Sequence, residues 1–99
     1  MSIYGITGVH VNELGRIVRA RLQQIDGASN TWIGQPNEVE AHQVANQIAT
    51  GDIIYSIFIV AGGIVHGPKF RLVVYPHGSD GIELEEDIEG RQVQDLVLF

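Results

Sequence analysis

Residues 37–51, NEVEAHQVANQIATG, predict one capped amphipathic helix in a chain that otherwise has the residue pattern of strands and turns. Asn37 is the expected N-cap, because its side chain can accept a hydrogen bond from a free amide of the first turn, and Glu40 can complete a capping box. Gly51 suits the left-handed conformation that commonly ends a helix. The two sides of the helix differ in polarity. Its apolar face holds Val39, Ala41, Val44, Ala45 and Ile48, and the opposite side holds Glu38, Glu40, Gln43 and Gln47.

Strand patterns lie on both sides of this helix. Residues 3–11 and 16–22 suit a hairpin, in which Gly15 supplies the positive φ that such a short loop favours at its end. The run 53–60 is apolar on both faces, which predicts a central strand covered on both sides. Further strands are predicted at residues 31–33, 69–75, 82–85 and 92–99.

This order of elements predicts an α+β fold formed by residues 1–99 as a single domain, since a chain of 99 residues has room for one core. We expect an antiparallel sheet of four to six strands, packed on one face by the single helix, in the order β-β-α-β-β-β. One helix covers one face of a sheet. The second face must therefore meet water, a partner or a second copy of the chain, and the doubly apolar central strand favours the last of these.

Composition excludes several functional classes. The chain has no cysteine, so it forms no disulfide and no thiolate metal site, and it has no apolar run of the roughly 18–20 residues that a membrane helix needs. Its formal net charge of −6 repels phosphate backbones, which makes nucleic acid a poor partner. We therefore expect a cytoplasmic protein that binds neither membranes nor nucleic acid.

No pattern of catalytic or cofactor-binding residues is present. The histidines lack the H-x-H or H-x-x-x-H spacing that places two metal ligands on one face of a strand or helix, and the serines lack the G-x-S-x-G nucleophile motif. The glycines near residue 62 precede a strand and not a helix, so no helix N-terminus is available there for a phosphate. We predict no catalytic residue, no metal and no cofactor. The histidines are His10, His42, His66 and His77, and the serines are Ser2, Ser29, Ser56 and Ser79.

The charged residues are unevenly distributed. Arg16, Arg19 and Arg21 gather in the second predicted strand, whereas acidic residues crowd the last twenty positions. This acidic segment could recruit a basic partner or hold two carboxylates for acid–base chemistry. It could equally form a solvated edge strand that pairs across the sheet with those arginines and prevents aggregation.

Two apolar features are candidates for an interface. Trp32 lies in polar surroundings at the end of a loop, so it either closes the helix–sheet core or anchors a protein partner. The C-terminal segment Leu96-Val97-Leu98-Phe99 must pack into the fold or against another subunit. The predicted interface residues are Trp32, Leu96, Leu98 and Phe99.

Several short motifs resemble a family of short bacterial domains of unknown function. They are Ile6-Thr7-Gly8-Val9 at the opening of a strand, Gly15-Arg16-Ile17 at a turn, a helix that ends in Ile48-x-x-Gly51, and the closing Asp95-Leu96-Val97-Leu98. The likeness spans most of the chain. It implies no activity and no site residue.

These observations favour a small non-enzymatic module that acts through a protein interface and self-associates. A first alternative is a small-molecule-binding protein or simple enzyme with a pocket between helix and sheet, lined by His42, Tyr55 or Trp32. A second is a nucleic-acid mimic, in which the acidic C-terminal segment occupies the basic groove of a partner.

Overall fold

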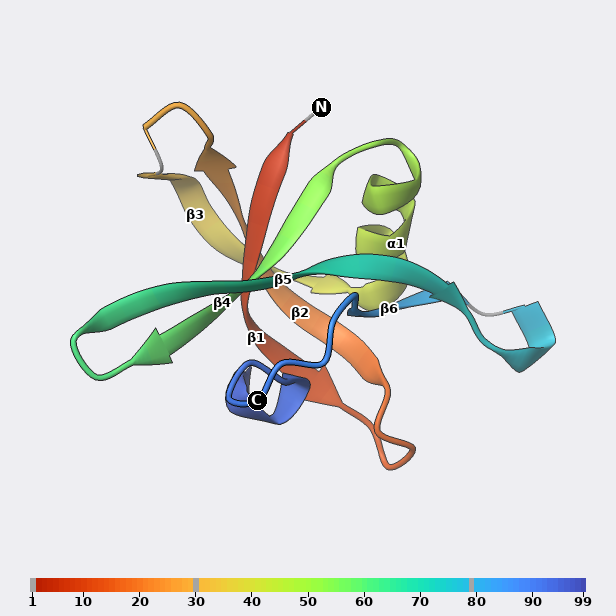
Figure 1. Cartoon of the computed structure of the whole chain (residues 1–99). Coiled ribbons are helices and arrows are strands. Elements are labelled where there is room, and N and C mark those ends of the chain that lie inside the picture. The colour runs from red at the N-terminus through yellow and green to blue at the C-terminus, as the bar shows by residue number, and fades with distance from the viewer. Residues whose placement is uncertain (1, 30, 79) are drawn as a thin grey trace.

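The computed structural model describes residues 2–29, 31–78 and 80–99, which form one curled sheet with one α-helix against it (Figure 1). The strands are β1 (Ile3–Val11), β2 (Ile17–Asp26), β3 (Thr31–Glu40), β4 (Ile53–Val60), β5 (Gly63–Val74), β6 (Asp80–Leu84) and β7 (Val97–Leu98). The helix is α1 (Ala41–Ala49), and two 3₁₀ turns occupy Pro76–Gly78 and Val93–Asp95.

The sheet is mixed and not purely antiparallel. The strand order is β3-β2-β1-β4-β5-β6, and β7 also pairs with β1. Along one edge β1 is antiparallel to β2, and along the other it is parallel first to β4 and then to β7. The α+β class is thus confirmed, but the predicted antiparallel sheet and its order are wrong. The connection through β2, β3 and α1 is long enough for the chain to return to the free edge of β1 in the same direction, as parallel pairing requires.

The helix begins later than the sequence pattern predicts. Residues 37–40 are the end of β3, where Asn37 is the register partner of Leu22 and Glu40 that of Arg19. The N-cap is therefore Glu40 and not Asn37, and the backbone N–H of Glu40 donates to Gln43 Oε1 over 2.9 Å. Pairing with β2 outweighs the local helical preference of these four residues. The prediction for the other end is confirmed, since Gly51 has a φ of 102°.

The core lies between α1 and one face of the sheet. The helix buries Ala41, Val44 and Ala45, and its closest neighbours are β5 and β6. Below it, Ile6 of β1 and Phe58 of β4 are fully buried. The other buried members of this cluster are Val9, Ile17, Ala20, Leu22, Ile54, Phe70, Ile82 and Leu96.

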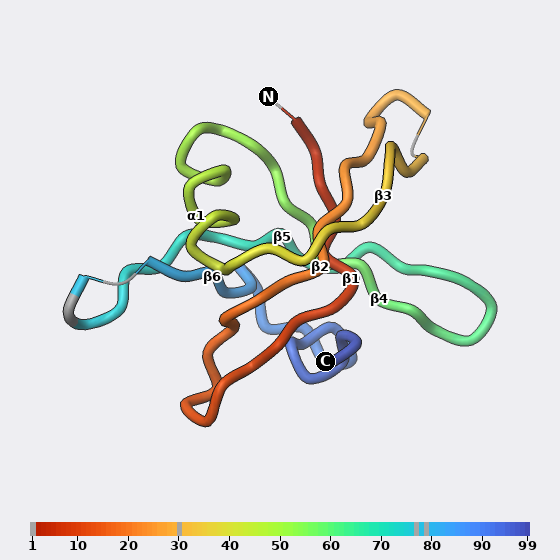
Figure 2. The backbone as a smooth tube through the Cα atoms, turned by 180° about the vertical axis from the view of Figure 1, so that it is seen from behind, coloured from red at the N-terminus to blue at the C-terminus, as the bar shows by residue number. Residues whose placement is uncertain are grey.

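Extra residues in alternate strands bend the sheet along one line. Thr7 is the extra residue of β1, Gly34–Pro36 oppose the single Gln23 of β2, and Gly67–Pro68 oppose the single Ser56 of β4. Such bulges increase the local twist and turn a strand. Because they lie at neighbouring levels of β3, β1 and β5, the whole sheet folds there, and the strands diverge on either side of the bend (Figure 2).

The bulge in β5 is held by a buried hydrogen bond. Ser56 is fully buried, and its Oγ donates to the backbone carbonyl of Pro68 over 2.7 Å. Gly67 allows this approach, because a Cβ at that position would lie 2.5 Å from Ser56 Oγ and would also collide with the ring of Phe58. The hydroxyl of Ser56 and the absent side chain of Gly67 therefore hold the bend in this strand pair.

We expect Ser56→Ala to lower the free energy of unfolding by about 1–3 kcal/mol, because the Pro68 carbonyl would be left buried without a donor. Urea unfolding followed by circular dichroism measures this change. Ser29→Ala is the matched control, since the Ser29 hydroxyl is exposed and its bonds to Thr31 and to the Asp26 carboxylate lie at the surface, where water can replace them, so its loss should cost less than the loss of the Ser56 hydroxyl. Equal costs for the two variants would contradict this role of Ser56.

Candidate functional site

A groove lies on the sheet face away from the helix. Side chains alternate along a strand, and Ile6 and Phe58 belong to the core beneath α1, so their neighbours Gly5 and Ile57 face the other side. Two hollows of about 110 and 290 Å³ lie on this face, and His66 lines both. The first is lined by Ile25, Thr31, Trp32, Ile57, Ile64 and His66, and the second by Ile3, Ile25, Gly27, Tyr55 and His66. Together they form what we term the Trp32 groove.

The floor of the Trp32 groove depends on a missing side chain. A Cβ on Gly5 would lie 2.7 Å from Ile57 Cγ1, 3.0 Å from Trp32 Cη2 and 3.1 Å from Ile25 Cδ1. These three side chains therefore close over the backbone of β1 only because residue 5 is glycine. Ile25 and Ile57 are buried, whereas the ring of Trp32 is 37% exposed at the rim.

Aromatic side chains give the groove its chemical character. Tyr55 and His66 have ring centroids 5.8 Å apart with an interplanar angle of 57°. His66 is the direct register partner of Ile57, so it stands beside the floor of the smaller hollow. The lining is aliphatic and aromatic, and it suits an apolar group better than a charged one.

A hydrogen-bonded turn holds the start of β3 at the rim. The carboxylate of Asp26 accepts a hydrogen bond from the backbone N–H of Ala28 over 3.0 Å. This bond, with the Ser29 hydroxyl as a second donor, holds the pKa of Asp26 below its ordinary value. The Ser29 hydroxyl also lies 2.7 Å from that of Thr31. The turn thus fixes the residue that precedes Trp32.

The second wall of the groove is the far half of the β4–β5 hairpin. Beyond the bend, residues 57–60 and 63–66 pair with each other and, within the described part of the chain, with no third strand. We term these two segments the ribbon. In Figure 1 it extends to the left, away from the other strands. Ile59 and Ile64 are direct register partners on it and are 61% and 52% exposed.

The ribbon also lacks acidic residues, lysine and arginine. From Ile53 to Pro68 the sequence contains no Asp, Glu, Lys or Arg. This stretch includes every residue of the ribbon, in a chain whose formal net charge is −6. Exposed β-branched side chains on an uncharged pair of strands are unusual at a surface that meets only water.

The residues predicted to form an interface occupy different environments. Trp32 lies at the groove, and Leu98 is exposed on β7. Leu96 is buried in the core of the chain itself, so a partner could reach it only if the tail moved. Phe99 packs over Gly8, and the guanidinium of Arg21 lies 4.3 Å from its ring centroid. Their role in an interface stays a prediction.

The two arginines of β2 pair with carboxylates of β3. Arg19 lies 3.5 Å from Glu40, and Arg21 lies 3.9 Å from Glu38, in agreement with the register of β2 and β3. For these two arginines the predicted pairing with the last acidic residues is therefore wrong. The guanidinium of Arg16, the third arginine of the predicted group, lies 4.0 Å from the ring centroid of Tyr75. The two exposed ion pairs contribute little to stability.

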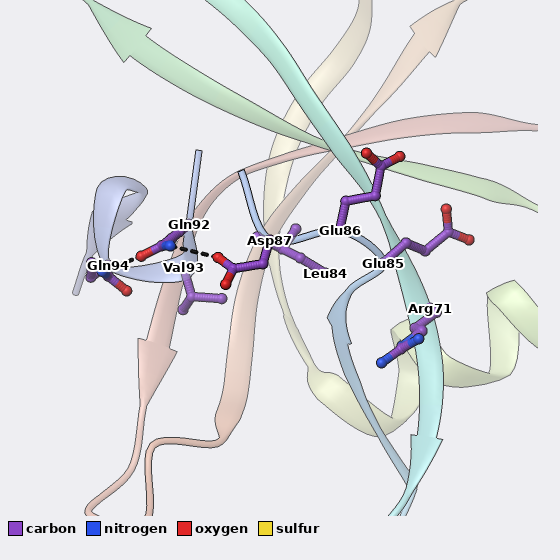
Figure 3. A pocket seen from close by; sticks show the side chains of 8 residues that line it. All are labelled: Arg71, Leu84, Glu85, Glu86, Asp87, Gln92, Val93 and Gln94. Atoms are coloured by element: carbon purple, nitrogen blue, oxygen red, sulfur yellow. Dashed lines mark hydrogen bonds between the residues drawn. The ribbon is translucent and has the colours of Figure 1, made fainter. Parts of the chain in front are cut away.

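The acidic segment surrounds an open hollow of about 430 Å³ next to β6. Figure 3 shows Asp87 turned toward Gln92, and Gln92 Nε2 donates a hydrogen bond to Asp87 Oδ1 over 2.5 Å. The carboxylates of Glu85 and Glu86 point away from Asp87. On β5, Arg71 Nε donates to Glu83 Oε1 over 2.8 Å. The carboxylates diverge and do not converge on one substrate position. The geometry therefore offers no acid–base pair of the kind considered from the sequence.

The histidines are dispersed. His10 contacts the backbone oxygen of Phe99, and His66 lies in the Trp32 groove. His42 lines a separate hollow of about 260 Å³ near Arg16, so the structure does not bring it to Trp32 and Tyr55 as the small-molecule alternative supposed. Within residues 2–29, 31–78 and 80–99, no three His, Asp or Glu side chains gather as metal ligands would. The side chain of His77 and all of Ser79 lie outside the described part.

Comparison with known proteins gives no relative. No protein-family model, no curated protein and no solved structure matches the chain. The resemblance to a family of short bacterial domains therefore stays a prediction. Among the described residues, no helix is long and apolar enough to cross a membrane.

The sequence identified Trp32 and Tyr55 as candidate pocket residues but not the other residues of the groove. Ile25, Ile57 and His66, which line the hollow beside Trp32, come from β2, β4 and β5. The importance of Gly5 follows only from the side chains that pack over it in the assembled sheet. The one available signal was the alternation in β4, which places Tyr55, Ile57 and Ile59 on the face opposite Phe58.

We expect Gly5→Ala to displace Trp32 from the groove floor, because the new Cβ has no room beside Ile57 and Trp32. The free energy of unfolding should fall by about 1–3 kcal/mol, and the emission of the single tryptophan should shift to longer wavelength. Gly8→Ala is the control, since a Cβ there meets Val97 and Phe99 and not the groove. Unchanged emission in Gly5→Ala would contradict this account of the floor.

We expect Asp26→Asn to lower stability at neutral pH, because the charged form of Asp26 is the form that the turn favours. A lowered pKa gives a contribution that is complete above the unfolded-state value of about 3.9 and is lost as the pH falls through the folded-state value. The difference between wild type and variant should thus vanish at strongly acid pH. Urea unfolding at pH 7 and pH 2 measures it.

Glu13→Gln, in the turn at the opposite end of β1, controls for the loss of one negative charge. A difference between wild type and Asp26→Asn that persists unchanged at pH 2 would refute the assignment to this carboxylate.

Proposed function

We propose that this protein is a non-enzymatic interaction module that binds a second copy of itself through the ribbon and the Trp32 groove. The observation that carries the proposal is the ribbon, with exposed Ile59 and Ile64 on a strand pair that contains no charged residue. The absence of cysteine suits association in the reducing cytoplasm, where we expect the protein to act.

Burial of this surface supplies the driving force. Ile59, Ile64 and Trp32 lie on one face, and full burial of an exposed isoleucine stabilises by about 1.5–3 kcal/mol, of which Ile59 and Ile64, at 61% and 52% exposure, can still gain a part. Among the described residues no strand pairs with the outer edges of the ribbon, which therefore offer backbone donors and acceptors to a partner. Proteins usually protect such edges with lysine, proline or a bulge. Residues 57–66 contain neither lysine nor proline.

Charge favours a second copy at this surface. Two molecules of net charge −6 repel each other at most approaches. Seven carboxylates lie between residues 80 and 95, on and after β6, and the ribbon holds none. A self-pair through the ribbon therefore brings the two copies together at the face where their repulsion is smallest.

The smaller hollow of the groove favours a protein side chain over a small molecule. Ligand pockets for typical small molecules measure about 300–1,000 Å³. The hollow beside Trp32 measures only about 110 Å³, whereas the second hollow, at about 290 Å³, lies at the lower end of that range. The hollow beside Trp32 has room for one branched side chain of a partner.

We expect Ile64→Lys to weaken self-association by about 100-fold or more, since association would then bury an unpaired ammonium group. Sedimentation velocity across a micromolar concentration range measures the shift toward monomer. Val74→Lys is the matched control, because Val74 lies in the same strand at its other end and is 65% exposed. Thermal unfolding confirms that both variants fold.

A wild-type protein that stays monomeric up to millimolar concentration would overturn the proposal. Equal weakening by Val74→Lys would place the association elsewhere on the molecule.

A further inference from the structure

We infer that the self-pair is locked by Ile59, whose side chain enters the smaller hollow of the Trp32 groove on the second copy. This inference rests on the proposed self-association and names the group that occupies the hollow.

The ribbon has a hollow at its base and an exposed side chain nearer its tip. At the base, Ile57 and its register partner His66 line the hollow beside Trp32. Ile59 lies two residues farther along β4 and therefore points to the same face as Ile57. Ile57 is fully buried, whereas Ile59 is 61% exposed with its side chain directed to solvent.

A two-fold axis makes these features complementary. In an isologous pair, the surface of one copy meets the same surface of the other, so residue i contacts j and j contacts i. When two ribbons stack face to face and antiparallel, the tip of each lies over the base of the other. The projecting Ile59 of one copy then meets the hollow beside Trp32 of its partner, and the contact occurs twice.

The hollow fits this occupant in chemistry and in size. Its walls include the aliphatic side chains of Ile25, Ile57 and Ile64 and the ring of Trp32. A volume of about 110 Å³ admits a branched aliphatic side chain. No Asp, Glu, Lys or Arg lines it, so an incoming apolar group buries none of these ions without a partner.

We expect Ile59→Ala to weaken self-association by about 10- to 100-fold, because the hollow would lose its occupant in both halves of the pair. Ile59→Leu, which conserves volume, should retain affinity within a few-fold. Val60→Ala is the matched control, since Val60 is the next residue along β4 and faces the other side of the ribbon. Sedimentation velocity gives the three affinities.

The fluorescence emission of Trp32 reports directly on whether the hollow is occupied, which a general loss of apolar contact area in Ile59→Ala would not change. It is the only tryptophan of the chain and lines the hollow. Dilution of the wild-type protein below its dissociation constant should shift the emission of Trp32 to longer wavelength as Ile59 leaves. Ile59→Ala should show the long-wavelength emission even at concentrations where it is paired.

The outcomes separate the two proposals. If the wild type pairs, but Ile59→Ala pairs equally well and leaves the Trp32 emission unchanged, the insertion is wrong and the self-association stands. If the wild type never pairs, the proposed function fails and this inference fails with it. If millimolar cyclohexanol shifts the Trp32 emission and raises the melting temperature of a monomeric wild type, the hollow is a small-molecule site and the inference is overturned.

Discussion

The hydrogen bond from the buried Ser56 hydroxyl to the carbonyl of Pro68 holds the bend on which the rest of the structure depends. A second bond of the same kind runs from Gln23 Nε2 to the carbonyl of Gly34 over 2.7 Å. Each joins a regular strand to the bulged strand beside it, and each satisfies a carbonyl that the bulge removes from the ladder. The side chains of β2 and β4 thus stabilise the bulges of β3 and β5.

This bend gives the two faces of the sheet different roles. On one side it wraps the strands around α1, where Ile6, Phe58 and Val44 are fully buried. On the other it carries the ribbon away from β1 and leaves a groove between the ribbon and the start of β3. A flat sheet of the same sequence would have no hollow beside Trp32. The Trp32 groove is therefore a product of the same bulges that close the core.

Local patterns in the sequence foretold much of the fold, and long-range pairing accounts for what they missed. Residue patterns identified β1, β4, the first part of β2 and the second half of β5, and the left-handed Gly51 ended the helix as expected. The helix start was misplaced because residues 37–40 satisfy a helical pattern and a strand pattern alike, and pairing with β2 decides between them. The parallel pairing of β1 with β4 leaves no local signal. For the site, Trp32 stood out by its surroundings, whereas Gly5 and His66 gain meaning only from neighbours distant in the chain.

The pairing of β7 with β1 bears on the kinetics of folding. Val97 pairs with Gly8, so one of the last strands joins one of the first, and β1 with β4 is also a non-local pair. Such topologies fold slowly, because distant segments must meet before their contacts stabilise anything. Until β1 is closed, the uncharged segment 53–60 remains open to neighbouring chains. Residues of β4 that we propose to pair two copies of the finished protein are thus also open to misassembly while the chain is still nascent.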